Sequence, residues 1–196
     1  AKANLRRTVS MRSHVIRMMV GATILAAGYA GTSQSRIVQA QGNAAPSAQQ
    51  VIGSWKATPQ EVAKKMIAKY GQPQEVTANR LIWHNNGPWK FTELVNEEIP
   101  HDFPVPHKDM LYQSINYGIK PETADALLEY DGSLILERTK GEIGARCDKE
   151  EANFLALNLA HDVATGRKSP ADARRFYADT IAAMMKENKI GDYLKG

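Results

Sequence analysis

Two short turn-forming segments constrain the fold of this 196-residue chain more than any other feature. The first, NNGP, ends at Pro88, and the second, TKG, ends at Gly141. Both lie between runs that are rich in aromatic and β-branched residues, which is typical of β-hairpins because asparagine and glycine adopt the backbone angles of tight turns. The predicted hairpins pair residues 80–84 with 89–95 and residues 134–138 with 142–147.

Helical patterns surround these hairpins. Thr58, Asp148 and Ser169 each precede such a pattern as expected N-caps, with a carboxylate three residues later. Residues 110–119 form a further predicted strand, although their apolar pattern also fits a helix. This order favours the α+β class: an antiparallel sheet built from two hairpins and a further strand, with helices packed on one side. The helices are expected at 58–70, 121–130, 148–166 and from 169 onward.

The net charge of +4 is unevenly distributed along the chain. Residues 1–40 contain six of the 25 lysines and arginines and none of the 21 acidic residues. The remainder therefore carries 19 basic and 21 acidic residues. A nucleic-acid-binding domain needs its positive charge in the folded part, so the sequence argues against a nucleic-acid partner.

The basic segment 1–40 has the composition of an export signal peptide. A basic opening precedes an apolar run at 18–31, and the segment ends in Val38-Gln39-Ala40, which suits cleavage before Gln41. The apolar run is shorter than the ~20 residues that a membrane-spanning helix needs, so no permanent transmembrane helix is expected after cleavage. Retention as an anchor stays open. We expect a flexible linker at 41–50 and a single α+β domain at 51–196, in the periplasm or secreted.

A proline-rich segment carries the residue types that bind metals. His101, His107 and Asp109 offer imidazole nitrogens and a carboxylate, the ligands of zinc and similar divalent ions. Pro100, Pro104 and Pro106 predict an extended, polyproline-like conformation at 98–108. With a rise of about 3.1 Å per residue, the two histidines would then lie roughly 19 Å apart, too far to share an ion unless the segment folds back. The alternative is that the imidazoles bond to backbone groups.

Two other features invite a functional interpretation. Trp83, His84, Trp89 and Phe91 flank the first hairpin turn and could form an exposed surface for a ligand or partner, although tryptophan more often packs in a core. Cys147, the only cysteine, directly precedes a predicted helix N-terminus, which favours a reactive thiolate. The hairpin pattern instead turns Cys147 inward, where a thiol behaves as a small apolar group.

Three stretches resemble a family of small exported bacterial proteins of unknown activity. They are KYGQPQEVT at 69–77, PHDFPVPHKD at 100–109 and DGSLILERTKGEIGARCDKEEANFLALNLAHDVATG at 131–166. The resemblance spans residues 55–175 and implies export and a stand-alone domain. It implies no activity and gives no residue a role.

The sequence supports three functional hypotheses. Because the G-x-S-x-G, H-E-x-x-H, C-x-x-C-H and glycine-rich phosphate motifs are absent, we expect a non-catalytic exported domain that binds an envelope or periplasmic protein partner and needs no cofactor. The alternative is a metal-dependent, hydrolytic enzyme that uses His101, His107 and Asp109. A third hypothesis is thiol or redox chemistry at Cys147.

Overall fold

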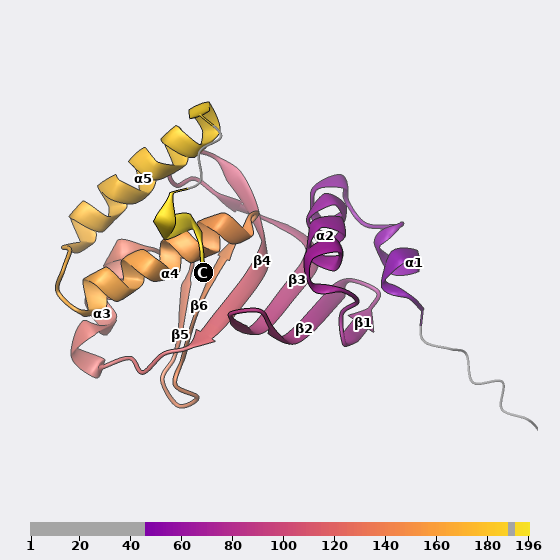
Figure 1. Ribbon diagram of the computed structural model, residues 1–196, viewed down its shortest axis with the longest axis horizontal. Coiled ribbons are helices and arrows are strands. Elements are labelled where there is room, and N and C mark those ends of the chain that lie inside the picture. Colours follow the sequence, from indigo (N-terminus) through magenta and orange to yellow (C-terminus); the bar gives the residue numbers. More distant parts are fainter. Residues whose placement is uncertain (1–45, 188–190) are drawn as a thin grey trace, which may run out of the picture. The chain divides into compact units, whose positions relative to one another are not determined.

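The computed structural model describes residues 46–187 and 191–196 (Figure 1). The predicted signal peptide at 1–40 and the first half of the predicted linker lie outside the described residues. The helix α1 (Ala48–Ile52) overlaps the end of that linker, and its N-cap Ser47 forms a capping box with Gln50. Ala48 is buried against the domain, so the folded part begins before residue 51.

A single antiparallel sheet of six strands organises the described residues, in the order β1-β2-β3-β4-β6-β5. Both predicted hairpins are present, as β2–β3 and β5–β6, and the strand expected at 110–119 is β4. The α+β class is therefore confirmed, with three strand pairings that the sequence did not predict, β1–β2, β3–β4 and β4–β6. The strands are β1 (Glu75–Thr77), β2 (Arg80–Asn86), β3 (Trp89–His101), β4 (His107–Asn116), β5 (Leu134–Glu137) and β6 (Glu142–Cys147).

The helices pack on one side of this sheet (Figure 1). Trp83, Thr92, Gln113 and Ala145 oppose one another across four neighbouring strands, so their side chains point to the same face. On that face one apolar cluster includes α1 and α2, and a second includes α3, α4 and α5. The remaining elements are α2 (Ala57–Tyr70), η1 (Pro121–Thr123), α3 (Ala124–Tyr130), α4 (Glu150–Ala164), α5 (Pro170–Glu187) and η2 (Asp192–Leu194).

Two of the three predicted helix caps are wrong. The N-cap of α2 is Lys56 rather than Thr58, and the N-cap of α4 is Lys149 rather than Asp148. Pro59 then lies inside the first turn of α2, which is tolerated because the first backbone N–H groups of a helix have no partner within it. Ser169 does cap α5, since its hydroxyl accepts a hydrogen bond from the N–H of Asp172.

The extended segment predicted at 98–108 is also wrong. β3 continues to His101, the chain turns within residues 102–106, and β4 begins at His107. Ile99 opposes Asp109, and Pro100 opposes Lys108, in an antiparallel register. The Phe103–Pro104 peptide bond in the turn is cis. Pro100 is tolerated in β3 because β3 beyond Val95 pairs only with β4. The side of the strand without a neighbour needs no backbone N–H, so the donor that proline lacks is not missed.

A buried carboxylate joins the two helical clusters through the sheet. Glu150, in the first turn of α4, is 7% exposed. Its Oε1 accepts hydrogen bonds from the Tyr70 hydroxyl at 2.5 Å, from Trp89 Nε1 at 2.6 Å and from Gln113 Nε2 at 3.3 Å, and Lys69 pairs with Oε2. These donors come from α2, β3 and β4, so one side chain fixes α4 against three other elements.

No helix in the ranges 46–187 and 191–196 is long and apolar enough to cross a membrane.

Candidate metal centre

The β3–β4 turn brings the predicted metal ligands together. His101 and His107 are cross-strand partners, and their ring centroids lie 4.8 Å apart. Asp109 lies two residues after His107 on β4, so its side chain points to the same face of the sheet. The separation of roughly 19 Å expected for a polyproline helix is therefore wrong, because the segment folds back on itself.

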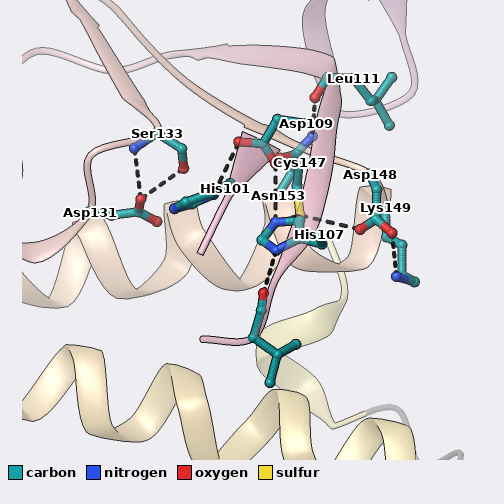
Figure 2. A network of polar contacts seen from close by, with 11 residues as sticks. His101, His107, Asp109, Leu111, Asp131, Ser133, Cys147, Asp148, Lys149 and Asn153 are labelled. Carbon is teal, nitrogen blue, oxygen red and sulfur yellow. Dashed lines mark hydrogen bonds and ion pairs between the residues drawn. The ribbon is translucent and has the colours of Figure 1, made fainter. Parts of the chain in front are cut away.

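The carboxylate of Asp109 contacts both imidazole rings (Figure 2). Its Oδ2 lies 3.1 Å from Nδ1 of His101, and its Oδ1 lies 3.1 Å from Nε2 of His107. Asp109 is only 5% exposed, and both histidines are partly buried. A buried carboxylate is costly unless other groups compensate its charge, and the two imidazoles are the groups that lie next to it.

The contacts have the distances of hydrogen bonds but not their geometry. Among the described residues, neither Oδ1 of Asp109 nor Nδ1 of His101 has a hydrogen-bond partner, although both atoms are buried. Ligand atoms bound to one ion at about 2.1 Å lie roughly 3.0–3.4 Å from one another without hydrogen bonds between them. Each imidazole has a nitrogen at such a distance from one oxygen of Asp109, and donor atoms of the three side chains lie within 4.8 Å of one another.

A backbone carbonyl orients the ring of His107. Its Nδ1 lies 2.8 Å from the carbonyl oxygen of Val105. Because a carbonyl can only accept, Nδ1 carries the proton and Nε2 is left to face Asp109. Histidine ligands of metals are commonly fixed by such a hydrogen bond from the other ring nitrogen.

In the absence of an ion, His107 is a strong base. The carboxylate of Asp109, followed by the contact with Cys147, raises the pKa of His107 to about 11. A metal ion bound at Nε2 would take the place of a proton there, so binding would release one.

No family model, curated protein or solved structure matches this chain. The resemblance to small exported bacterial proteins therefore stays a prediction.

Cys147 extends the cluster on the side of β6. Its Sγ lies 3.5 Å from Nε2 of His107 and 3.5 Å from Oδ1 of Asp148 (Figure 2). The predicted inward orientation is confirmed, since the side chain is buried in the core. Burial raises the pKa of the Cys147 thiol, and the contact with His107 only partly opposes this. A thiol in this state does not suit rapid redox or nucleophilic chemistry.

A cavity of about 350 Å³ lies next to the cluster. His107 and Cys147 form part of its wall, and most of the remaining lining is apolar. Val105 and Met185 are exposed at this site. The cavity therefore connects the imidazole and the thiol to solvent and offers space for a small ligand.

The aromatic surface predicted around the first hairpin is wrong for both tryptophans. Trp83 is 0% exposed and Trp89 is 1% exposed, and their indole N–H groups bind the Gly71 carbonyl and Glu150. Trp83 lies on the inner face of the sheet, and Trp89, at the start of β3, stacks on Phe154 of α4. His84 and Phe91 do stack edge to face near the surface, where His84 pairs with Glu75 at 2.6 Å, but within residues 46–187 and 191–196 neither of them belongs to a candidate metal-binding group.

Sequence reasoning missed two members of the site. It did not connect Val105 or Cys147 with His107, because Cys147 is 40 residues away in the chain and reaches His107 only through the β4–β6 pairing. The prolines on either side of Val105 were the one local indication of a turn that could bring its carbonyl to His107. Glu150 carried no signal at all, since its donors are 37 to 81 residues away.

Proposed function

We propose that this domain binds a divalent transition-metal ion through His101, His107 and Asp109. One observation carries the proposal: each imidazole offers a nitrogen 3.1 Å from an oxygen of Asp109, and one donor atom from each of the three side chains lies within 4.8 Å of the others. Two of these buried atoms, Nδ1 of His101 and Oδ1 of Asp109, have no hydrogen-bond partner among the described residues. Buried polar atoms in folded proteins are almost always paired, so this cluster needs a partner that the side chains do not supply to one another.

The donor set favours ions of the zinc class. Two imidazoles and one carboxylate suit Zn²⁺, Co²⁺, Ni²⁺ and Fe²⁺, whereas Ca²⁺ and Mg²⁺ prefer sites built entirely from oxygen atoms. The hydrogen bond from His107 to the Val105 carbonyl and the cross-strand pairing of the two histidines hold the donors in place before an ion arrives. Such preorganisation lowers the entropic cost of binding.

Three protein ligands leave a coordination position for water or a substrate. Catalytic zinc sites have this composition, and structural sites use four protein ligands instead. The cavity beside His107 would give such a position access to a small molecule. These features favour the metal-dependent alternative over the purely non-catalytic one, and hydrolysis at a metal-bound water is the chemistry that they suit best.

Export and partner binding stay predictions. The predicted signal peptide lies outside the described residues. Of the aromatic surface predicted to contact a ligand or partner, both tryptophans are buried in the core. The metal proposal does not depend on either of them.

Isothermal titration of the purified chain with Zn²⁺ tests the proposal. We expect about one equivalent of Zn²⁺ to bind. His101→Ala, His107→Ala and Asp109→Asn should each weaken binding by more than about 100-fold, because substitution of residues that only hydrogen-bond to metal ligands already lowers metal affinity about 10- to 100-fold. His84→Ala is the matched control, because its ring is 44% exposed and lies outside the cluster. Binding of less than about a tenth of an equivalent, or an equal loss in the control, would refute the proposal.

A further inference from the structure

We propose that Cys147 gives its thiolate to the same ion, so that the centre prefers thiophilic ions such as Cd²⁺ and Zn²⁺ over Mn²⁺. This inference rests on the metal site formed by His101, His107 and Asp109. It adds a fourth protein ligand, from a different strand, and so strengthens the preference for soft ions that two imidazoles and a carboxylate already have. The thiolate would fill the coordination position that the three hairpin residues leave open, so a water or substrate would bind only as a fifth ligand.

The position of the sulfur fits a ligand of the ion that His107 binds. Sγ of Cys147 lies 3.5 Å from Nε2 of His107, the nitrogen that also faces Asp109. Around a zinc-class ion with bonds of about 2.1 Å to nitrogen and 2.3 Å to sulfur, a tetrahedral arrangement separates these two atoms by roughly 3.6 Å. Two groups of donors, each within 4.8 Å of one another, share His107: His101, His107 and Asp109 form the first, and His107, Cys147 and Asp148 form the second. An ion at Nε2 of His107 would therefore draw the sulfur toward the first group.

One nitrogen cannot satisfy both of its neighbours. Nε2 of His107 has either one proton or one lone pair, yet it lies 3.1 Å from an oxygen of Asp109 and 3.5 Å from the sulfur of Cys147. Among the described residues, the Asp109 oxygen is left without a hydrogen bond although its residue is almost fully buried. An ion next to Nε2 would bind nitrogen, oxygen and sulfur together, which no single proton can do.

The fold fixes the sulfur on this side of the hairpin. Cys147 is the last residue of β6 and opposes Leu111 of β4, so the strand pairing holds its backbone next to that of the histidine strand. The cavity lined by His107 and Cys147 gives an ion a route to both. On binding, the thiol proton, now directed at Oδ1 of Asp148, would pass to that carboxylate and then to solvent, and sulfur would bond to the ion.

Substitution with Co²⁺ separates this inference from the proposed function. The d–d absorption of the full-length chain reports that the ion is bound, and a thiolate-to-cobalt charge-transfer band in the near ultraviolet reports a sulfur ligand. We expect both signals in the wild type, loss of only the charge-transfer band in Cys147→Ser, and loss of both in His107→Ala. His84→Ala should keep both signals.

The possible outcomes are distinct. Cobalt d–d bands without a charge-transfer band in the wild type would overturn the role of Cys147 and leave the three-ligand site intact. The absence of both signals would overturn the metal site itself. Far-ultraviolet circular dichroism of ion-free Cys147→Ser shows whether the variant is folded.

Competition between Cd²⁺ and Mn²⁺ tests the selectivity and does not depend on the spectra. We expect Cys147→Ser to lower the affinity for Cd²⁺ by at least about tenfold and to leave the affinity for Mn²⁺ nearly unchanged, because only the soft ion gains from a thiolate. An equal change for both ions would show that the substitution disturbs the site as a whole, and would refute the inference.

Discussion

Replacement of Glu150 by alanine should destabilise the domain more than any other single change of a charged side chain outside the metal centre. Its carboxylate accepts hydrogen bonds from Tyr70, Trp89 and Gln113 and pairs with Lys69. The substitution leaves the indole N–H of Trp89 buried without its acceptor, because Trp89 is 1% exposed. It also releases the first turn of α4 from α2, β3 and β4.

The expected loss in the free energy of unfolding is about 2–4 kcal/mol, because buried hydrogen bonds to a charged group contribute about 1.5–3 kcal/mol each and their effects are not additive. The ion pair with Lys69 adds little, since the Lys69 side chain is 53% exposed. The unpaired donor of Trp89 accounts for about 1–3 kcal/mol of the loss. Gln113 adds less, because its amide nitrogen also lies 3.5 Å from the hydroxyl of Thr92. A domain of this size is typically stable by about 5–15 kcal/mol, so the effect is easily measured.

Urea denaturation, followed by tryptophan fluorescence and circular dichroism, measures the change. Glu151→Ala is the matched control, because it removes the same group from the same helical turn, and it should cost less than about 1 kcal/mol. In the Glu150→Ala background, Trp89→Phe should cost at least about 1 kcal/mol less than in the wild type, since its donor has already lost its acceptor. Equal costs for the two glutamates, or full additivity with Trp89→Phe, would refute the reasoning.

Three further predictions follow from burial and charge. Burial raises the pKa of Glu150, but hydrogen bonds from its neighbours outweigh this and hold the pKa below its ordinary value of 4.5. The ionised carboxylate therefore stabilises the fold above pH 4.5, and this stabilisation is lost as the pH falls through the lower pKa of the folded state. Urea midpoints measured across pH 3–6 should depend less on pH in Glu150→Gln than in the wild type. Trp83→Ala should cost about 3–5 kcal/mol in urea unfolding and Phe91→Ala clearly less; equal costs would contradict the burial of Trp83. In the ion-free folded chain, Cys147 should react slowly with a thiol reagent at neutral pH and quickly in denaturant, whereas rapid labelling of the folded chain would support the redox hypothesis.

Local turn chemistry made two of the hairpins predictable. Asn85 and Gly87 have positive φ angles in the first turn, and Gly141 has one in the second. These are conformations that glycine and asparagine adopt at low cost, so the residue types alone indicate the turns. Ser169 capped its helix as expected for a similar reason, because a hydroxyl next to a first turn bonds to a free N–H group.

The β3–β4 hairpin was not predictable from the same signals. Pro100, Pro104 and Pro106 lack backbone donors, which argued for an extended segment outside any sheet. The structure places Pro104 and Pro106 in the turn and Pro100 in a part of β3 that has only one neighbouring strand, so the missing donors are not needed. Which strand has a neighbour on only one side depends on contacts between distant parts of the chain, so the local sequence does not show that proline is tolerated here.

The candidate site was predictable in its residue types but not in its geometry. His101, His107 and Asp109 were identified because imidazole and carboxylate groups bind metals, and the turn then determined that they meet. The contact between His107 and Cys147 depends on the β4–β6 register, which the sequence does not specify. The burial of Trp83 and Trp89 depends likewise on which face of the sheet the helices cover.

Anomalous diffraction at the zinc edge, from crystals of the full-length chain grown with saturating Zn²⁺, tests the central claim most directly. The account predicts a strong peak bonded at about 2.1 Å to Nδ1 of His101, Nε2 of His107 and a carboxylate oxygen of Asp109. A map with no peak between the two imidazole rings, or with zinc only at exposed residues such as His84, would contradict it.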